Sequence, residues 1–153
     1  MHKIDFIDLK ILRIIQEKGR ISNFELSEKV GISSSACHRR MNILENEKVI
    51  IGYKAILNEK VINFKMTVYV KIKLTKQIDE ALKSFERSVK LIPEVLECHL
   101  MSGEADYLLK VVSKDIDDFE RVHKQHISKL PFVSNVISSF ALRNIFGIKG
   151  YPI

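Results

Sequence analysis

The sequence predicts an α+β chain in which three helices precede a segment of order βαββαβ. Up to residue 47 the apolar residues recur at helical spacing, in three runs separated by glycine and serine turns. From residue 66 onward, runs of alternating apolar and polar residues are interrupted by two further helical runs. These observations divide the chain into a helical domain at residues 1–57, a hinge at 58–65 and a second domain at 66–153.

The first predicted helix runs from Asp5 to about Lys18. Asp5 is a suitable N-cap, and Asp8 in the first turn favours the positive end of the helix dipole. Apolar residues between Leu9 and Ile15 form its buried stripe, and Gly19 ends it. This helix is expected to support the two that follow.

Residues 21–47 have the pattern of a helix-turn-helix. Ser22 can cap the first of two short helices, with Glu25 closing a capping box. Gly31 stands where the chain leaves that helix in a left-handed conformation, and Ser33 or Ser34 can cap the second. A turn of this kind between two short helices is typical of proteins that place the second helix in the major groove of DNA.

The second helix of the motif has one apolar and one polar face. Cys37, Met41 and Leu44 follow i, i+4, i+7 spacing and are expected to face the first helix. The outer face offers short hydroxyls, an imidazole, a guanidinium and an amide, which suit base edges and phosphates. We therefore predict DNA contacts from Ser34, Ser35, His38, Arg39 and Asn42.

Three further predictions concern the edge of this surface. Arg40 lies nearer the packed side than Arg39, so it either reaches a phosphate or pairs with a carboxylate of the core. One of Ser34 and Ser35 is expected to serve as a cap alone. The β-rich run at residues 49–57, with its glycine turn, predicts a wing that carries Lys54 as a backbone contact. These features together describe a winged helix-turn-helix, followed by a hinge in which Asn63 tolerates a left-handed turn.

The second domain is predicted to be ferredoxin-like. Strands are expected at residues 66–75, 94–102, 106–113 and 132–143, with helices at 79–91 and 115–130. The order βαββαβ leaves one face of the sheet uncovered. An uncovered apolar face usually pairs with a second copy, so we expect a homodimer.

Charge and composition agree with a nucleic-acid partner but do not locate its site. The net charge is +6, and residues 1–60 carry 11 Lys or Arg against 8 Asp or Glu, the same excess as the rest of the chain. Cys37 and Cys98 fall inside predicted elements and are expected to be free thiols in a reducing cytoplasm. No apolar run reaches the ~18 residues of a membrane span. We therefore expect a cytoplasmic, nucleoid-associated protein.

The loop SGEAD at residues 102–106 is the candidate ligand site. Backbone N–H groups around Gly103 suit a carboxylate, and Glu104 or Asp106 suits the ammonium of a free amino acid. The alternative is a plain hairpin turn with solvated carboxylates, which the spacing alone favours.

The chain resembles the leucine-responsive / asparagine-operon (Lrp/AsnC, feast/famine) transcription regulators over nearly its whole length. Four segments carry the resemblance: IDFIDLKILRIIQEKGRIS, VGISSSACHRRMNILENEKVIIGYKAILN, MSGEADYLLKVV and LPFVSNVISSFAL. The sequence departs from the family at Lys48 and Asn63, where relatives commonly have glycine.

The resemblance implies a transcription regulator that binds double-stranded DNA and responds to a small amino-acid effector. It also implies dimers that assemble into octamers. The effector is expected at a contact between dimers, around the loop at residues 102–106. Met101, Ser102, Gly103, Glu104 and Asp106 would line the site, and Ser138 and Ser139 would approach from a neighbouring subunit.

The sequence contains no pattern typical of an enzyme, a metal site or a cofactor. His123 and His126 lie three residues apart but lack further ligands at metal-binding spacing. No nucleophile, base and orienting group occur together, and no Gly-rich phosphate loop is present. Two alternatives stay open: a sirohaem-type tetrapyrrole decarboxylase, as in some proteins that resemble this family, and an architectural DNA-wrapping protein without an effector.

Overall fold

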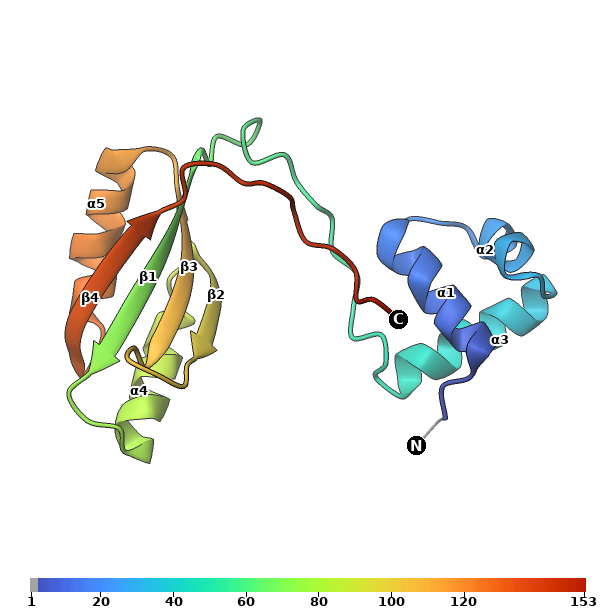
Figure 1. Ribbon diagram of the computed structural model, residues 1–153, viewed down its shortest axis with the longest axis horizontal. Helices are drawn as coiled ribbons and strands as arrows, with labels where there is room; N and C mark the ends of the chain where they lie inside the picture. The colour runs from blue at the N-terminus through green and yellow to red at the C-terminus, as the bar shows by residue number, and fades with distance from the viewer. Residues whose placement is uncertain (1–2) are drawn as a thin grey trace. The chain divides into compact units, whose positions relative to one another are not determined.

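The computed structural model describes residues 3–153 (Figure 1). The chain forms two compact units. One runs to Ile56 and also takes in Ile145–Ile153, and the other is Leu57–Asn144. We call them the N-terminal and C-terminal units, and residues 145–153 the tail. Among the described residues, no helix is both long and apolar enough to span a membrane.

The N-terminal unit contains three helices, and their N-caps follow the sequence. They are α1 (Phe6–Glu17), α2 (Asn23–Val30) and α3 (Ser34–Asn46). Asp5 caps α1 in a reciprocal capping box with Asp8, and Ser22 accepts a hydrogen bond from the Glu25 N–H at 3.1 Å. Ser33, rather than Ser34, caps α3. The predicted helix boundaries are confirmed to within a residue or two.

The turn between α2 and α3 has the predicted left-handed glycine. Gly31 has φ 84° and ψ 39°, and its N–H donates to the Ser27 carbonyl at 2.9 Å. The two helices pack with α1 around one buried cluster. Its members are Ile11, Leu12, Leu26, Val30, Cys37 and Leu44.

The prediction that the wing at residues 49–57 contains β-structure is wrong. Residues 51–58 have no regular structure, and Ile51 and Ile56 are almost fully exposed. A β-strand requires a partner whose backbone completes its hydrogen bonds, and none of the described residues pairs with this run. The left-handed conformation expected at Asn63 is present, with φ 65°, and Lys48 also has positive φ, 58°.

The C-terminal unit has the predicted βαββαβ order. Its elements are β1 (Met66–Leu74), α4 (Asp79–Val89), β2 (Val95–Leu100), β3 (Tyr107–Ser113), α5 (Ile116–Gln125), a 3-10 turn η1 (Ile127–Lys129) and β4 (Val133–Phe140). The antiparallel sheet has the strand order β2-β3-β1-β4. This arrangement is the ferredoxin-like fold.

The two helices of this unit cover the same face of the sheet (Figure 1). Val68, Val70 and Ile72 of β1 are completely buried there, packed against Phe85 of α4 and Val122 of α5. The opposite face is uncovered, as expected, but it is mixed rather than apolar. Exposed Tyr69 and Ile137 lie among lysines, of which Lys71 and Lys73 are also exposed. This open face positions the candidate ligand site.

Candidate functional site

The outer face of α3 carries polar side chains that the fold leaves available. Arg39, His38, Asn42 and Ser35 are exposed, whereas Cys37 on the opposite side is completely buried. The His38 ring and the Asn42 amide lie 3.2 Å apart. One helical face therefore presents a guanidinium, an imidazole, an amide and a hydroxyl together, which matches the donors and acceptors of DNA.

Ser34 lies at the inner side of the same helix. Its hydroxyl is 3.1 Å from the hydroxyl of Ser27 in α2, and its carbonyl accepts a hydrogen bond from the Asn23 side chain at 2.8 Å. These two contacts fix the start of α3 against α2. Ser35 remains exposed, with its hydroxyl 3.2 Å from that of Ser33.

Arg40 forms an ion pair with two carboxylates of the first helix. Its Nη1 donates to Asp8 at 2.7 Å and to Asp5 at 2.8 and 2.9 Å. Asp8 is completely buried, and the Arg40 side chain is only 23% exposed. The backbone N–H of Asp8 and then Arg40 hold the pKa of Asp5 below its usual value. Arg40 is therefore engaged within the fold through carboxylates of α1, which is one of the two roles predicted for it.

The segment after α3 is attached to α3 by Tyr53. The Tyr53 hydroxyl donates to Glu45 at 2.8 Å. Burial, followed by this hydrogen bond, raises the pKa of Tyr53 to about 12. Lys54 is exposed in the irregular segment. It is thus near α3 in sequence, but on a segment without a strand to orient it.

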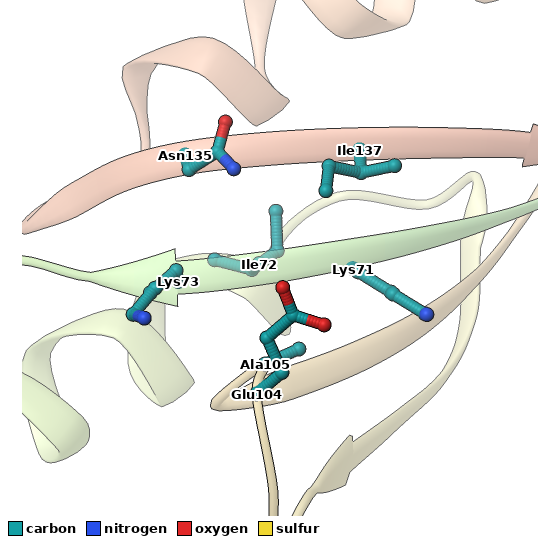
Figure 2. Close-up of a pocket in the computed structure, with 7 residues that line it drawn as sticks. All are labelled: Lys71, Ile72, Lys73, Glu104, Ala105, Asn135 and Ile137. Atoms are coloured by element: carbon teal, nitrogen blue, oxygen red, sulfur yellow. The ribbon is translucent and has the colours of Figure 1, made fainter.

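A hollow opens on the uncovered face of the C-terminal sheet (Figure 2). Lys71, Ile72 and Lys73 of β1 form one side, and Glu104 and Ala105 come from the loop between β2 and β3. Asn135 and Ile137 of β4 complete the lining. In Figure 2 the Glu104 carboxylate lies over β1, with Lys71 on one side and Lys73 on the other. The hollow is therefore lined by one carboxylate, one amide and two lysine side chains, with Ile137 as its exposed apolar residue.

Asp106 does not line this hollow. It is 7% exposed, and its carboxylate accepts hydrogen bonds from the Leu74 N–H at 2.7 Å and the Gln77 amide at 2.6 Å. Its own N–H donates to the Ile72 carbonyl. Asp106 thus fastens the loop to the end of β1. Of the two carboxylates considered for an ammonium group, only Glu104 is accessible.

The other predicted ligand residues lie around the hollow rather than in it. Met101, Ser102 and Gly103 are exposed in the loop. Ser139 pairs with Tyr69 and Ser138 with Val70 across the β1–β4 ladder. Sequence reasoning missed Lys71, Lys73 and Asn135. The two lysines alternate with buried residues of β1, so the strand pattern already placed them on the open face.

No group of three or more His, Cys, Asp or Glu side chains in the described part of the chain is arranged to hold a metal ion. Cys37 is buried and Cys98 is exposed. Burial raises the pKa of the Cys37 thiol, so it belongs to the core rather than to a reactive site.

Two family models match the chain, one for each unit. Residues 4–51 match a winged helix-turn-helix DNA-binding model, and residues 67–147 match the Lrp/AsnC ligand binding domain. The second match alone covers more than half of the chain. The chain belongs to the Lrp/AsnC family. It is therefore a DNA-binding transcriptional regulator with a ligand-binding domain, which confirms the regulator expected from the sequence rather than an enzyme.

Curated relatives of this Lrp/AsnC protein are transcriptional regulators, and the match extends over most of each chain. The proline dehydrogenase transcriptional activator of Rhizobium radiobacter is 38% identical over 142 residues, which are 93% of this chain and 91% of the relative. The leucine-responsive regulatory protein of Escherichia coli K12 is 37% identical over 132 residues, which are 86% of this chain and 80% of the relative.

Solved structures agree with this assignment. A transcriptional regulator from Neisseria meningitidis in complex with L-methionine has a TM-score of 0.92 and 33% identity, covering 98% of this chain and 97% of that one. An AsnC family regulator from Agrobacterium tumefaciens has a TM-score of 0.91 and 38% identity, covering 97% and 96%. The fold and its helix-turn-helix are thus those of known regulators.

Proposed function

We propose that the chain reads operator DNA with the outer face of α3 and binds a free amino acid at the hollow beside Glu104. The proposal that α3 reads DNA rests on the different positions of its polar side chains. Arg40 and Ser34 are used inside the fold, whereas Arg39, His38 and Asn42 are exposed along one face. The fold therefore supports α3 from one side and leaves the other side for DNA.

Arg39 is the residue assigned the main DNA contact. An arginine that binds a guanine edge contributes about 1–3 kcal/mol. We expect Arg39→Ala to weaken operator binding by roughly 10- to 100-fold at constant salt. Arg87→Ala on α4 is the matched control, because it removes the same charge from an exposed helix of the other unit. Unchanged operator affinity of Arg39→Ala would refute the assignment of α3 as the recognition helix.

The hollow has the charges that a free amino acid requires. Glu104 suits the ammonium group, and Lys71, Lys73 and the Asn135 amide suit the carboxylate. Ile137, which is 50% exposed, provides apolar surface for the ligand's side chain. The related Neisseria regulator in complex with L-methionine supports a ligand of this class.

The effector is proposed to act through assembly of the protein. Tyr69 and Ile137 on the open sheet face are 42% and 50% exposed, and a second copy packed on this face would cover them. We propose a homodimer built on this face, with further association to an octamer on the nucleoid. Met101, Ser102, Gly103, Ser138 and Ser139 would then approach the ligand across a contact between subunits.

A thermal-shift screen of the twenty amino acids, with light scattering of any hit, tests the effector proposal. A ligand at 100 times its Kd stabilises its binding domain by about 2.7 kcal/mol, which raises the unfolding midpoint. Glu104→Gln should abolish the shift, and Glu80→Gln, an exposed carboxylate on α4, should preserve it. A full shift in Glu104→Gln would refute the site.

The second candidate function is an architectural DNA-wrapping protein without an effector. The net charge of +6 is consistent with it, because neutralised phosphates contribute to affinity without sequence information. It predicts no thermal shift with any amino acid and equal affinity for unrelated duplexes. A selective ligand that changes the oligomeric state would exclude it.

A further inference from the structure

The tail is held on α1 through a pairing between one side chain and one backbone unit. The Tyr151 N–H donates to Gln16 Oε1 at 2.6 Å, and the Gln16 amide nitrogen donates to the Tyr151 carbonyl at 3.4 Å. Arg13 donates a further hydrogen bond to the carbonyl of Ile153. A carboxamide that both donates to and accepts from one residue fixes the position of the peptide backbone at that residue.

Glycine at position 150 makes room for this contact. A Cβ at Gly150 would lie 2.9 Å from Cβ of Gln16 and 3.0 Å from its Cδ and Oε1. A Cβ at Gly147, three residues earlier in the same tail, would meet nothing within 4 Å. The need for glycine is therefore specific to the residue that crosses Gln16.

An apolar groove of the N-terminal unit continues the contact. α1 contributes Leu12 and Ile15 to its lining, and the segment after α3 contributes Val49 and Ile50. Ile153 lies in this groove and is 38% exposed, whereas Leu142, before the tail, is 99% exposed. Hydrogen bonds, close backbone approach and apolar contact thus all occur at residues 150–153.

We propose that residues 150–153 are a latch that binds the groove on α1 and restrains the DNA-reading helices. The chain passes from β4 into the tail, so the docked latch gives the N-terminal unit a second connection to the C-terminal unit, besides residues 47–65; its contact with α1 is non-covalent. The contact consists of three hydrogen bonds that involve the side chains of Gln16 and Arg13, and of one apolar residue, Ile153, that is 38% exposed. It is small enough to open without unfolding either unit.

The latch affects DNA binding when the N-terminal units of two subunits bind one operator together, and this step rests on the proposed function. In a dimer, binding of one recognition helix makes the binding of the second intramolecular. The effective concentration of the second helix rises when its freedom is restricted around the productive geometry. An open latch should therefore weaken binding to an operator with two half-sites and leave binding to a single half-site unchanged.

Hydrogen exchange of the tail amides in the full-length protein tests whether the latch is docked. The Tyr151 and Ile153 N–H groups are hydrogen-bonded and should exchange more slowly than those of a free peptide. Gln16→Ala and Gly150→Val should bring the Tyr151 N–H to the free-peptide rate. Gly147→Val, in the same tail but in open space, should retain the protection.

DNA binding by the same variants tests what the latch does. The probes are a duplex selected from a random pool by the wild-type protein, and a shortened duplex that keeps one half-site. We expect Gln16→Ala, Gly150→Val and deletion of residues 145–153 to bind the full duplex about 10-fold more weakly, and the half-site duplex as the wild type does. Gly147→Val should match the wild type on both.

Three results would overturn the proposal. If the Tyr151 N–H of Gly150→Val still exchanged slowly, the contact between Gly150 and Gln16 would not be what holds the tail on α1. Equal loss of affinity for both duplexes would show that the tail supports the fold of the N-terminal unit instead. Released tails with unchanged affinity for both duplexes would remove the role in DNA binding. A wild-type protein that selects no duplex would refute the proposed function, whereas the exchange experiment would still decide whether the tail is docked.

Discussion

Two adjacent arginines of α3 have different roles because they point in different directions around the helix. Arg40 neutralises the completely buried Asp8, whereas Arg39 is exposed. Removing one partner of an ion pair leaves the other charge desolvated. We expect Arg40→Ala to lower the unfolding free energy of the N-terminal unit by about 2–3 kcal/mol, and Arg39→Ala to change it by less than about 0.5 kcal/mol. Urea denaturation followed by circular dichroism measures both.

The Asp5 cap makes the N-terminal unit sensitive to acid. The pKa of Asp5 lies below its ordinary value, because the Asp8 N–H and Arg40 stabilise the ionised form. This contribution is complete above the unfolded pKa of about 3.9 and is lost as the pH falls through the lower folded pKa. Asp5→Asn should therefore lower the melting temperature at pH 6 and flatten its decline below pH 4. Asp79→Asn, a 90% exposed carboxylate, is the control; a parallel decline in Asp5→Asn and the wild type would contradict the assignment.

Lys48 occupies a backbone conformation that suits glycine. Its φ of 58° places an L-residue in the left-handed region, which costs about 1 kcal/mol or more. We expect Lys48→Gly to raise the unfolding free energy by several tenths of a kcal/mol, since glycine's greater freedom in the unfolded chain offsets part of the gain. Lys29→Gly, in the last turn of α2, should instead be destabilising. A lower unfolding free energy of Lys48→Gly in urea denaturation would refute the inference that the backbone at Lys48 is strained.

Local features of the residues were predictable, and distant partners were not. Asp5, Ser22 and Gly31 act within four residues along the chain, so their roles follow from spacing. The Arg40–Asp8 pair joins residues 32 positions apart, so the sequence predicts a core carboxylate only as one of two possible partners of Arg40. The first strand of the C-terminal unit was predictable because a period-2 pattern extends along β1.

At the scale of elements, the segment after α3 shows that amino-acid composition alone does not predict a β-strand. Residues 49–57 are rich in β-branched residues, yet they form no strand, because strand formation depends on a partner elsewhere in the chain. The candidate ligand site has a similar limit. Glu104 and Asp106 are two residues apart in one loop, but only the structure shows that the first is exposed and the second buried.

The loop between β2 and β3 therefore contains two carboxylates with different roles: Asp106 stabilises the fold, and Glu104 is the one proposed to bind the ligand. Asp106→Ala would leave the Leu74 N–H without its partner in a buried position, at a cost of about 1–3 kcal/mol in the unfolding free energy of the C-terminal unit. Glu104→Ala should leave that free energy within about 0.5 kcal/mol of wild type and abolish the amino-acid thermal shift. Denaturation curves with and without ligand distinguish the two. Equal destabilisation by both changes would contradict this division.

At the scale of the whole molecule, each unit has a core of its own. Leu44 belongs to the buried cluster of the N-terminal unit, and Phe85 to that of the C-terminal unit, where its ring stacks on Tyr107 at 4.4 Å between centroids. Each cluster draws its residues from one unit only. Folding of one unit therefore does not require the apolar contacts of the other.

Separate cores predict separate unfolding transitions. Leu44→Ala should destabilise the N-terminal unit by about 2–5 kcal/mol and Phe85→Ala the C-terminal unit by about 3–5 kcal/mol, because each leaves a cavity in one core. In differential scanning calorimetry each substitution should lower one transition and leave the other in place. Phe85→Ala should also remove the amino-acid stabilisation while single half-site DNA binding persists. If both substitutions shifted one common transition, the two units would fold as a single cooperative body, and DNA reading and ligand binding would have to share its stability.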